Sequence, residues 1–211
     1  LASLIPHVFT SLRKDKTSNL IVDLRDCSGG SIEISMEFMT YLISKPFSYV
    51  LESSLKKNLP SKIEPHIKEG SFYDFPGSTR VDDSDIYSST WSSVFSPKKK
   101  RFKGNIYFIA DGGVTSAGGM LLAILKNQKI GKIIGEETAG SFCTGSNGVK
   151  VKLPNSGILV EISQSEGSVS LKDEVNNGFG VFPDYPVTKT FSDILQGKDA
   201  EINLIKRLIK N

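Results

Sequence analysis

Residues 105–126 read NIYFIADGGVTSAGGMLLAILK, and this stretch decides the fold class. Apart from Asn105, its first six residues are apolar and mostly β-branched or aromatic, which predicts a buried strand. A turn with glycines on both sides of Ser116 follows, and then the helical stretch Met120–Lys126. A strand that leads through a tight turn into a helix is typical of α/β proteins.

The rest of the chain repeats this alternation of strands and helices. The spacing of apolar residues predicts helices at Ser3–Lys14, Ile32–Lys45 and Asp199–Lys210. Apolar runs predict strands at Leu20–Leu24, Phe47–Leu51 and Lys132–Gly135, and paired strands 149–153 and 158–162 around the turn 154–157. Together these elements predict an α/β protein with a mixed sheet, in a single core over residues 1–211.

Residues 52–100 differ from the rest of the chain in composition. They are rich in serine, charge and proline, and no clean period runs through them. We therefore expect an irregular insertion within the core. Long loops of this kind are usually functional or mobile. Phe72, Tyr73 and Trp91 are candidate substrate anchors in it, and a dangling surface loop is the alternative.

Charge and composition exclude several classes of protein. The 211 residues carry a net charge of +3, too little to argue for nucleic acid, and we interpret the basic run 98–103 as a solvated loop. Two cysteines form neither a disulfide framework nor a four-cysteine zinc site, and we expect no metal and no cofactor. The longest apolar run, Met120–Leu125, is far shorter than the ~20 residues of a membrane span.

Ser116 is the strongest chemical candidate because it lies where the helix after the turn should begin. Free N–H groups and the positive end of the helix dipole at that place favour the negative charge that a serine nucleophile and its intermediate develop. The small neighbours Ala117 and Gly118 would let a substrate backbone approach. In the plainer interpretation, Ser116 or Thr115 only caps the helix.

A second glycine turn ends the sequence LIVDLRDCSGG at residues 20–30. Gly29 and Gly30 can turn the chain tightly and point N–H groups into a cleft, as one arm of an oxyanion hole would require. The segment lacks the Lys-Ser/Thr ending of a phosphate-binding loop and the spacing of a dinucleotide fingerprint, which excludes both kinds of nucleotide site. We expect Cys27 to be a small buried filler.

Five segments, in order along the chain, resemble the motifs of one enzyme family. Residues 20–30 resemble its D-L-R-x-N-x-G-G signature, and Ser116 with Ala117 resembles its nucleophile turn. IGEETAG at 134–140 resembles G-E-x-T-x-G, GVFPDYPV at 180–187 resembles G-V-x-P-D-x-x-V, and GKD at 197–199 resembles the G-x-D before the last helix. The family is that of the C-terminal processing (tail-specific) peptidases and tricorn, which are serine endopeptidases.

This resemblance implies a ClpP/crotonase-like fold of β-β-α units and an endopeptidase that forms an acyl-enzyme at Ser116. It implies an oxyanion hole made by the N–H of Ala117 and of Gly29 or Gly30, and a peptide or protein as substrate. Since bacterial members are mostly exported, it also implies a periplasmic or cell-envelope location. The sequence does not reveal the cleavage preference or the oligomeric state.

The general base is the point at which the sequence departs from the family. In the processing-peptidase branch a lysine follows G-E-x-T-x-G, but Ser141 stands there, and Lys150 and Lys152 downstream are expected to be solvent-facing strand residues. The tricorn-like branch uses a histidine, a second serine and a glutamate, which Glu174 would match.

In that branch the histidine precedes the D-L-R strand. We therefore expect the chain to be part of a longer protein that supplies it, with His7 as the candidate within the chain, because a histidine titrates near neutral pH. His66, in the insertion, is the other histidine.

Two other functions remain open at this point. The same fold serves in ligand- or peptide-binding modules without catalysis, and the missing lysine would suit one. A crotonase-type acyl-thioester enzyme would share the two-amide oxyanion hole but needs an adenine-nucleotide site that the sequence does not show. The serine turn and the intact Gly29-Gly30 pair favour the peptidase.

Overall fold

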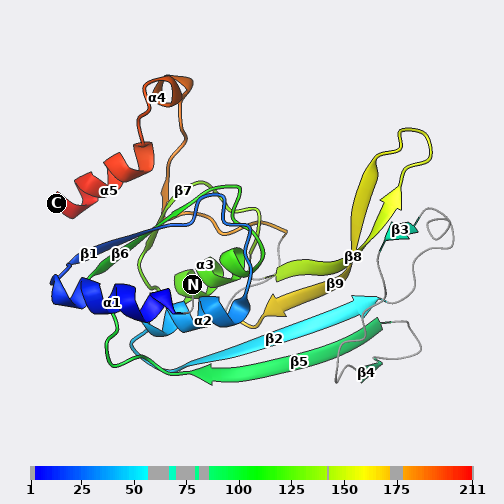
Figure 1. Ribbon diagram of the computed structural model, residues 1–211, viewed down its shortest axis with the longest axis horizontal. Helices are drawn as coiled ribbons and strands as arrows, with labels where there is room; N and C mark the ends of the chain where they lie inside the picture. Colours follow the sequence, from blue (N-terminus) through cyan, green and yellow to red (C-terminus); the bar gives the residue numbers. More distant parts are fainter. Residues whose placement is uncertain are drawn as a thin grey trace. The chain divides into compact units, whose positions relative to one another are not determined.

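In the computed structural model, which describes residues 3–56, 67–69, 79–80, 86–141, 143–171 and 178–210, the chain divides into two units. The first unit comprises Leu1–Ser48, Val94–Phe142 and Leu171–Asn211, and the second comprises Tyr49–Ser93 and Cys143–Ser170. Each unit has its own sheet, labelled in Figure 1.

Four parallel strands form the sheet of the first unit, in the order β1-β6-β7-β10. Their bounds are Asn19–Asp23 (β1), Asn105–Ala110 (β6), Lys132–Gly135 (β7) and Tyr185–Pro186 (β10). The helices are α1 (Leu4–Lys14), α2 (Ile32–Thr40), α3 (Ser116–Asn127), α4 (Phe191–Leu195) and α5 (Ala200–Lys210). Parallel neighbours need a crossover between them, and α3 provides it from β6 to β7.

The central strand β6 is buried on both faces, as its apolar run predicts. Tyr107 and Ile109 pack with Ile134 of β7 and Ile205 of α5 on one face. Alternation turns Phe108 to the opposite face, and Figure 1 shows α1, α2 and α3 on the side of the strands away from α5. Every residue of α3 from Ala117 to Leu125 is buried, so this helix lies inside the unit and its first turn is firmly held.

Six strands form the sheet of the second unit, in the order β3-β8-β9-β2-β5-β4. Their bounds are Phe47–Lys56 (β2), Ile67–Glu69 (β3), Thr79–Arg80 (β4), Ile86–Phe95 (β5), Cys143–Lys152 (β8) and Leu159–Val169 (β9). β8 and β9 pair antiparallel, and the N–H of Leu153 and of Gly157 donate across the turn to Ile158 and Leu153. The predicted paired strands around this turn are confirmed.

The segment 52–100 is more regular than its composition suggests. β2 runs on to Lys56, and β5 occupies ten residues of the segment for which the sequence predicts an irregular insertion. The fully buried Tyr49 packs edge-on against Trp91, with the ring centroids 5.4 Å apart. The sequence IYSSTWSSVF does not predict a strand, because its serines give no clean alternation of apolar and polar residues. Phe72 and Tyr73 lie outside the described residues.

A charged network ties the first strand of the core to the last helix. The Arg25 guanidinium contacts the carboxylates of Asp23 and Asp199, the latter at 2.9 Å. It also lies 3.6 Å from Oε2 of Glu201, whose side chain is 1% exposed. The other Glu201 oxygen is 3.3 Å from Nζ of Lys189. The Arg of the D-L-R motif and the Asp of the G-x-D motif are therefore joined in one ion-pair network.

The network lowers the pKa of the carboxyl groups of Asp23 and Asp199. Burial alone would raise the pKa of Asp199, but the N–H of Ile202 at 2.9 Å and the Arg25 guanidinium outweigh it, so the pKa lies below its ordinary value of 3.8. The hydrogen bond from Arg25 lowers the pKa of Asp23. Asp199 also accepts a free N–H at the start of α5 and so stabilises that helix end.

We predict that Arg25→Leu lowers the free energy of unfolding by about 3 kcal/mol, because it leaves Glu201 buried with Lys189 as its remaining cation. Urea denaturation measures the change. Lys206→Leu, at an exposed position of α5, is the control and should shift stability by less than about 0.5 kcal/mol.

The pH dependence distinguishes the network from lost packing. Asp23 and Asp199 bind protons less tightly in the folded chain, so their contribution is complete above the ordinary value of 3.8 and is lost as the pH falls through the lower folded pKa values. The Arg25→Leu variant should therefore lose less stability between pH 5 and about pH 2 than the wild type does. Parallel pH profiles of the two proteins would contradict the assignment.

Candidate active site

Ser116 is the first residue of α3 and follows directly on the turn after β6. Its φ is +50°, the left-handed region, whereas Thr115 before it is extended. A non-glycine residue in this region is strained by roughly 1–2 kcal/mol, and such strain gathers where a side chain must be held in a set direction. The half-buried Ser116 thus occupies a sharp strand-to-helix turn of the kind that presents a nucleophile.

Two glycine backbones press on this turn from separate loops. A Cβ on Gly29 would lie 2.6 Å from the Cβ of Ser116 and 3.0 Å from the backbone N of Ala117. A Cβ on Gly140 would lie 2.8 Å from the Cα of Thr115 and 2.9 Å from the N of Ser116. Both positions leave no room for a side chain. We call this packing of Gly29 and Gly140 on residues 115–117 the glycine clamp.

Hydrogen bonds fix the first loop of the clamp to the nucleophile turn. The N–H and the hydroxyl of Thr115 each donate at 3.0 Å, to the carbonyl oxygens of Cys27 and Ser28 respectively. Asp111, at the end of β6, accepts from the N–H of Asp26 at 3.1 Å and from that of Gly113 at 3.0 Å. The loop from β1 and the turn from β6 therefore form one rigid body of backbone.

The second loop of the clamp is held by the G-E-x-T-x-G and G-V-x-P-D motifs. The N–H of Val181 donates to the Thr138 hydroxyl at 2.8 Å, and the N–H of Gly180 donates to Glu137 at 2.8 Å. The N–H of Gly140 donates to the carbonyl of Val114 at 2.9 Å. These two motifs act as scaffolding that holds Gly140 against Ser116. The sequence did not assign roles to Thr138 and Asp111, because their partners lie far away in the chain.

The predicted oxyanion-hole residues lie on both sides of Ser116. In α3 the N–H groups of Gly118 and Gly119 donate to Thr115, whereas no hydrogen bond recorded among the described residues uses the N–H of Ala117. Gly29 and Gly30 both have positive φ, +98° and +135°. The structure brings Ala117 and Gly29 together at Ser116, and Gly30 lies next to them, exposed.

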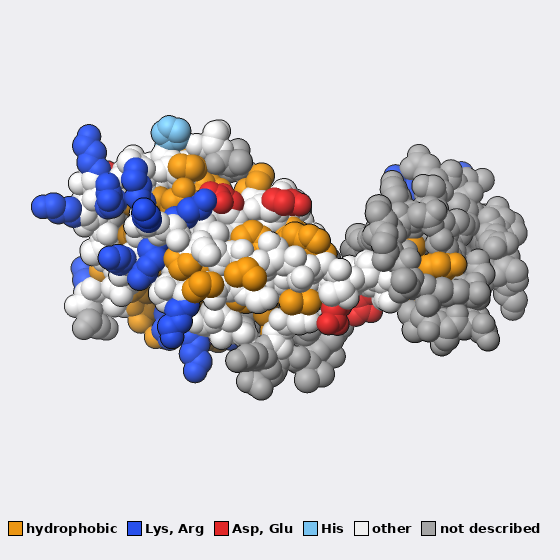
Figure 2. All heavy atoms as spheres, turned by 90° about the horizontal axis from the view of Figure 1, so that it is seen from below, with side chains coloured by type: hydrophobic (Ala, Val, Ile, Leu, Met, Phe, Trp, Pro, Cys, Tyr) orange, Lys and Arg blue, Asp and Glu red, His pale blue; other side chains and the backbone are white. Residues whose placement is uncertain are grey.

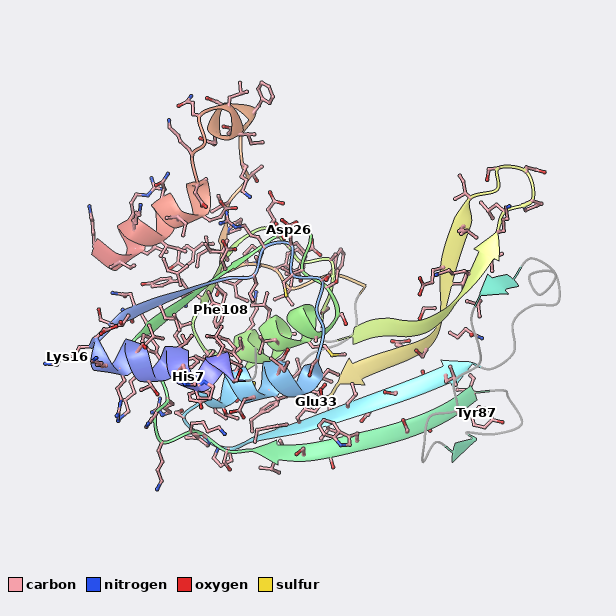
Figure 3. All side chains as sticks on the ribbon, viewed as in Figure 1. His7, Lys16, Asp26, Glu33, Tyr87 and Phe108 are labelled. Atoms are coloured by element: carbon pink, nitrogen blue, oxygen red, sulfur yellow. The ribbon has the colours of Figure 1, made fainter. Side chains whose placement is uncertain are left out.

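The predicted acid–base residues are placed differently. His7 is exposed on α1, and its Nδ1 lies 2.7 Å from the carbonyl oxygen of Ser3 in the same segment. Figure 3 shows His7 well separated from Asp26, which lies on the loop that packs against the nucleophile turn. Glu174 and His66 are outside the described residues, and Lys150 and Lys152 are exposed on β8 of the second unit. The roles of His7 and Glu174 remain predictions.

An apolar pocket of about 320 Å³ opens beside the glycine clamp. It is lined by Ile5, Val22, Leu24, Cys27, Gly29, Gly30, Ser31, Ile34, Ser35, Phe38, Gly118 and Leu121. Cys27, expected to be a buried filler, is half-buried and forms part of this wall. The sequence did not reveal the pocket, although Ile34 and Phe38 stand one helical turn apart on α2, which is the signal that could have pointed to it.

The helix that supplies much of this wall begins with a fixed cap. The Ser31 hydroxyl accepts from the N–H of Ile34 at 3.2 Å and donates to Glu33 at 2.6 Å. That hydrogen bond lowers the pKa of the Glu33 carboxyl. In the part of the chain that the structure describes, no cluster of three or more His, Cys, Asp or Glu residues could hold a metal ion.

A comparison with protein families gives the site its context. The sequence profile of peptidase family S41 matches residues 2–187. The chain belongs to peptidase family S41. This finding confirms the family predicted from the five motifs, and it makes Ser116 the candidate nucleophile of an S41 chain.

Solved structures share the fold of this S41 chain. Mature CPAF complexed with lactacystin superposes with a TM-score of 0.62 at 15% identity, over 98% of this chain and 46% of that one. A candidate peptidase from Parabacteroides merdae gives 0.60 at 18%, over 97% and 56%. The photosystem II D1 C-terminal processing protease gives 0.50 at 20%, over 85% and 37%. A comparison with curated proteins finds no match.

These similarities confirm the α/β fold class, with one parallel and one antiparallel sheet, as in S41 peptidase folds. The S41 chain covers 56% of the length of the P. merdae protein. It covers less than half of the other two, 46% of CPAF and 37% of the D1 processing protease. No helix among its described residues is long and apolar enough to cross a membrane.

We predict that Gly29→Ala in this S41 chain slows covalent labelling of Ser116 by a fluorophosphonate about a hundredfold, because the new methyl group displaces the reacting side chain. It should also destabilise the fold by more than about 1 kcal/mol, since alanine disfavours a φ of +98°. Mass spectrometry and denaturation measure the two effects.

Gly112→Ala is the matched control, because a Cβ there meets nothing within 4 Å. It should label at the wild-type rate. If Gly29→Ala also labelled at that rate, the clamp would not position Ser116.

Proposed function

We propose that this S41 chain is the catalytic core of a serine endopeptidase that cleaves peptide bonds through an acyl-enzyme at Ser116. The glycine clamp carries the proposal: it holds a strained serine at the start of a buried helix, beside the N–H of Ala117, which no hydrogen bond recorded among the described residues uses. A side chain that only capped the helix would accept a backbone hydrogen bond, and the side chain of Thr115, the N-cap residue, accepts no such bond.

The reaction follows from these groups. The Oγ of Ser116 bonds to the carbonyl carbon of the scissile peptide while its proton passes to a general base. The carbonyl oxygen becomes an oxyanion that accepts hydrogen bonds from the N–H of Ala117 and of Gly29 or Gly30, near the positive end of the α3 dipole. Return of the proton to the leaving amine breaks the C–N bond, and water hydrolyses the ester.

We propose a histidine as the base, with Glu174 as its orienting acid, as in the tricorn-like branch. His7 is the candidate within the chain, and a histidine from an upstream segment of a longer protein is the other. A tail-specific action on exported substrates in the periplasm or cell envelope is part of the same proposal, and the resemblance to the processing peptidases supports it.

The apolar pocket supports a preference for an apolar side chain next to the cleaved bond. Its wall includes Gly29, Gly30 and Gly118, so a substrate whose carbonyl sits at the oxyanion hole would have its neighbouring side chain at this pocket. Val22, Leu24 and Leu121 offer that side chain a dry surface, and its burial supplies binding energy at about 25 cal/mol per Å².

We predict that Ile34→Trp, which fills the pocket, lowers kcat/KM at least tenfold for peptides with Leu or Phe before the cleaved bond, and less for peptides with Ala. Ile32→Trp is the matched control, because Ile32 lies on the same helix and does not line the pocket. Equal losses for both peptides would show that another surface selects this side chain.

The decisive experiment is labelling with a fluorophosphonate, followed by peptide mapping. We expect an adduct at Ser116 and complete loss of both the adduct and peptide hydrolysis in Ser116→Ala. The chain is tested alone and with its upstream sequence attached. Labelling in both proteins places the base within these 211 residues, and labelling only in the longer one places it upstream.

A reaction at another serine would refute the assignment of the nucleophile. Absence of labelling in both proteins would favour the alternative, a catalytically inactive binding module on the same fold.

A further inference from the structure

A cleft of about 470 Å³ lies where α1 ends, and its wall is rich in cationic residues. The lining consists of Phe9, Leu12, Arg13, Lys16, Thr17, Ser18, Lys99, Lys100, Arg101, Phe102, Lys103 and Gly104. It therefore holds two arginines and four lysines and no acidic residue. In Figure 2, Lys and Arg side chains gather at the left end of the molecule, the end at which Figure 3 places Lys16. We call this feature the basic cleft.

The six cations of the basic cleft form no ion pair recorded among the described residues. Lys98, the neighbour of the cleft residues, differs from them: its Nζ lies 3.1 Å from Glu37 and 5.9 Å from the ring centre of Tyr41. Asp15, next to Lys16 in the chain, is exposed and does not line the cleft. The positive charge in the cleft is therefore not neutralised by the cleft itself.

The backbone that carries these cations is anchored. The N–H of Lys98 donates to Thr40 at 2.9 Å, and that of Phe102 donates to Tyr41 at 2.8 Å. Phe102 itself is buried. The sequence predicts a solvated loop for the basic run. Its lysine side chains are exposed, but its backbone is fixed on the end of α2. Lysines on a fixed backbone lose less freedom when they bind than lysines on a flexible one.

The opposite wall is equally fixed. The carbonyls of Ser11, Leu12 and Arg13 at the end of α1 already accept backbone N–H groups, from Asp15, Thr17 and Lys16. A Cβ on Gly104 would lie 2.1 Å from the carbonyl oxygen of Ser18, so the two walls are in direct backbone contact. The side chains of Arg13 and Lys16 are thus not needed to satisfy the helix end, and their donors remain available to a ligand.

We propose that the basic cleft binds a compact phosphate-bearing anion, either free in solution or as the headgroup of a lipid. Guanidinium groups match the geometry of phosphate oxygens in pairs, and lysines add point charges around them. The cleft is hollow and small, which suits a group with several charges on a few atoms. A nucleic-acid duplex needs an extended basic surface. The overall charge of +3 leaves too little excess positive charge to form one.

The experiment compares two charge-matched double variants of the whole chain. Lys99→Ala/Lys100→Ala removes two cations from the basic cleft, and Lys206→Ala/Lys210→Ala removes two exposed cations from α5. Calorimetric titration with inorganic tripolyphosphate at low salt should show a roughly tenfold weaker Kd for the first variant and an unchanged Kd for the second. Thermal unfolding of both variants checks that they fold.

Sedimentation with vesicles distinguishes the two sources of phosphate. Binding to phosphatidylglycerol vesicles but not to phosphatidylcholine vesicles, weakened by the first variant, identifies a lipid headgroup; binding of tripolyphosphate alone identifies a soluble ligand. Equal weakening by both variants, no binding of either probe, or tighter binding of an oligoglutamate peptide than of tripolyphosphate would overturn the proposal.

Discussion

The close packing of three backbone segments at the carboxyl ends of parallel strands is the constraint on which the site depends. The loop after β1, the turn after β6 and the loop after β7 meet where a Cβ on Gly29 or Gly140 would lie within 3 Å of the Ser116 turn. No side chain can enter this region, so the direction of Ser116 is set by backbone atoms. A side chain held in this way needs no reorganisation when a ligand binds beside it.

The sequence motifs gain a physical meaning from this packing. Arg25 fastens the loop after β1 to α5, and Thr138 fastens the loop after β7 to the segment before β10. Asp184 exchanges hydrogen bonds with Ile133 at 2.8 Å in both directions, which fixes the edge of the sheet. Most of the motif residues therefore affect Ser116 indirectly. They fix the loops that pack against the Ser116 turn.

The sequence could predict whatever depends on local pattern. The apolar run of β6, the turn before Ser116 and the amphipathic α5 all follow from periodicity and glycine placement. Contacts between distant segments could not be predicted this way: the pairing of Arg25 with Asp199 spans 174 positions, and the apolar pocket needs α1 and α2 to meet. The sequence does not predict β5, because serines in adjacent pairs place small polar side chains on both faces and remove the alternation that identifies a strand. The Gly29-Gly30 pair predicts a turn, but the contact of Gly29 with Ser116 depends on how distant segments pack and does not follow from local pattern.

The distance along the chain between the members of the Arg25 network also determines when the network can form during synthesis. Arg25 is made before its partners Asp199 and Glu201, and Asp199 follows it by 174 positions. During synthesis the loop that carries Gly29 thus waits for α5 before its support is complete, and contacts of such long sequence separation form late in folding. A nascent copy cannot present a fully supported Ser116 turn before α5 has been made. The order of synthesis itself delays the completion of this support until α5 exists.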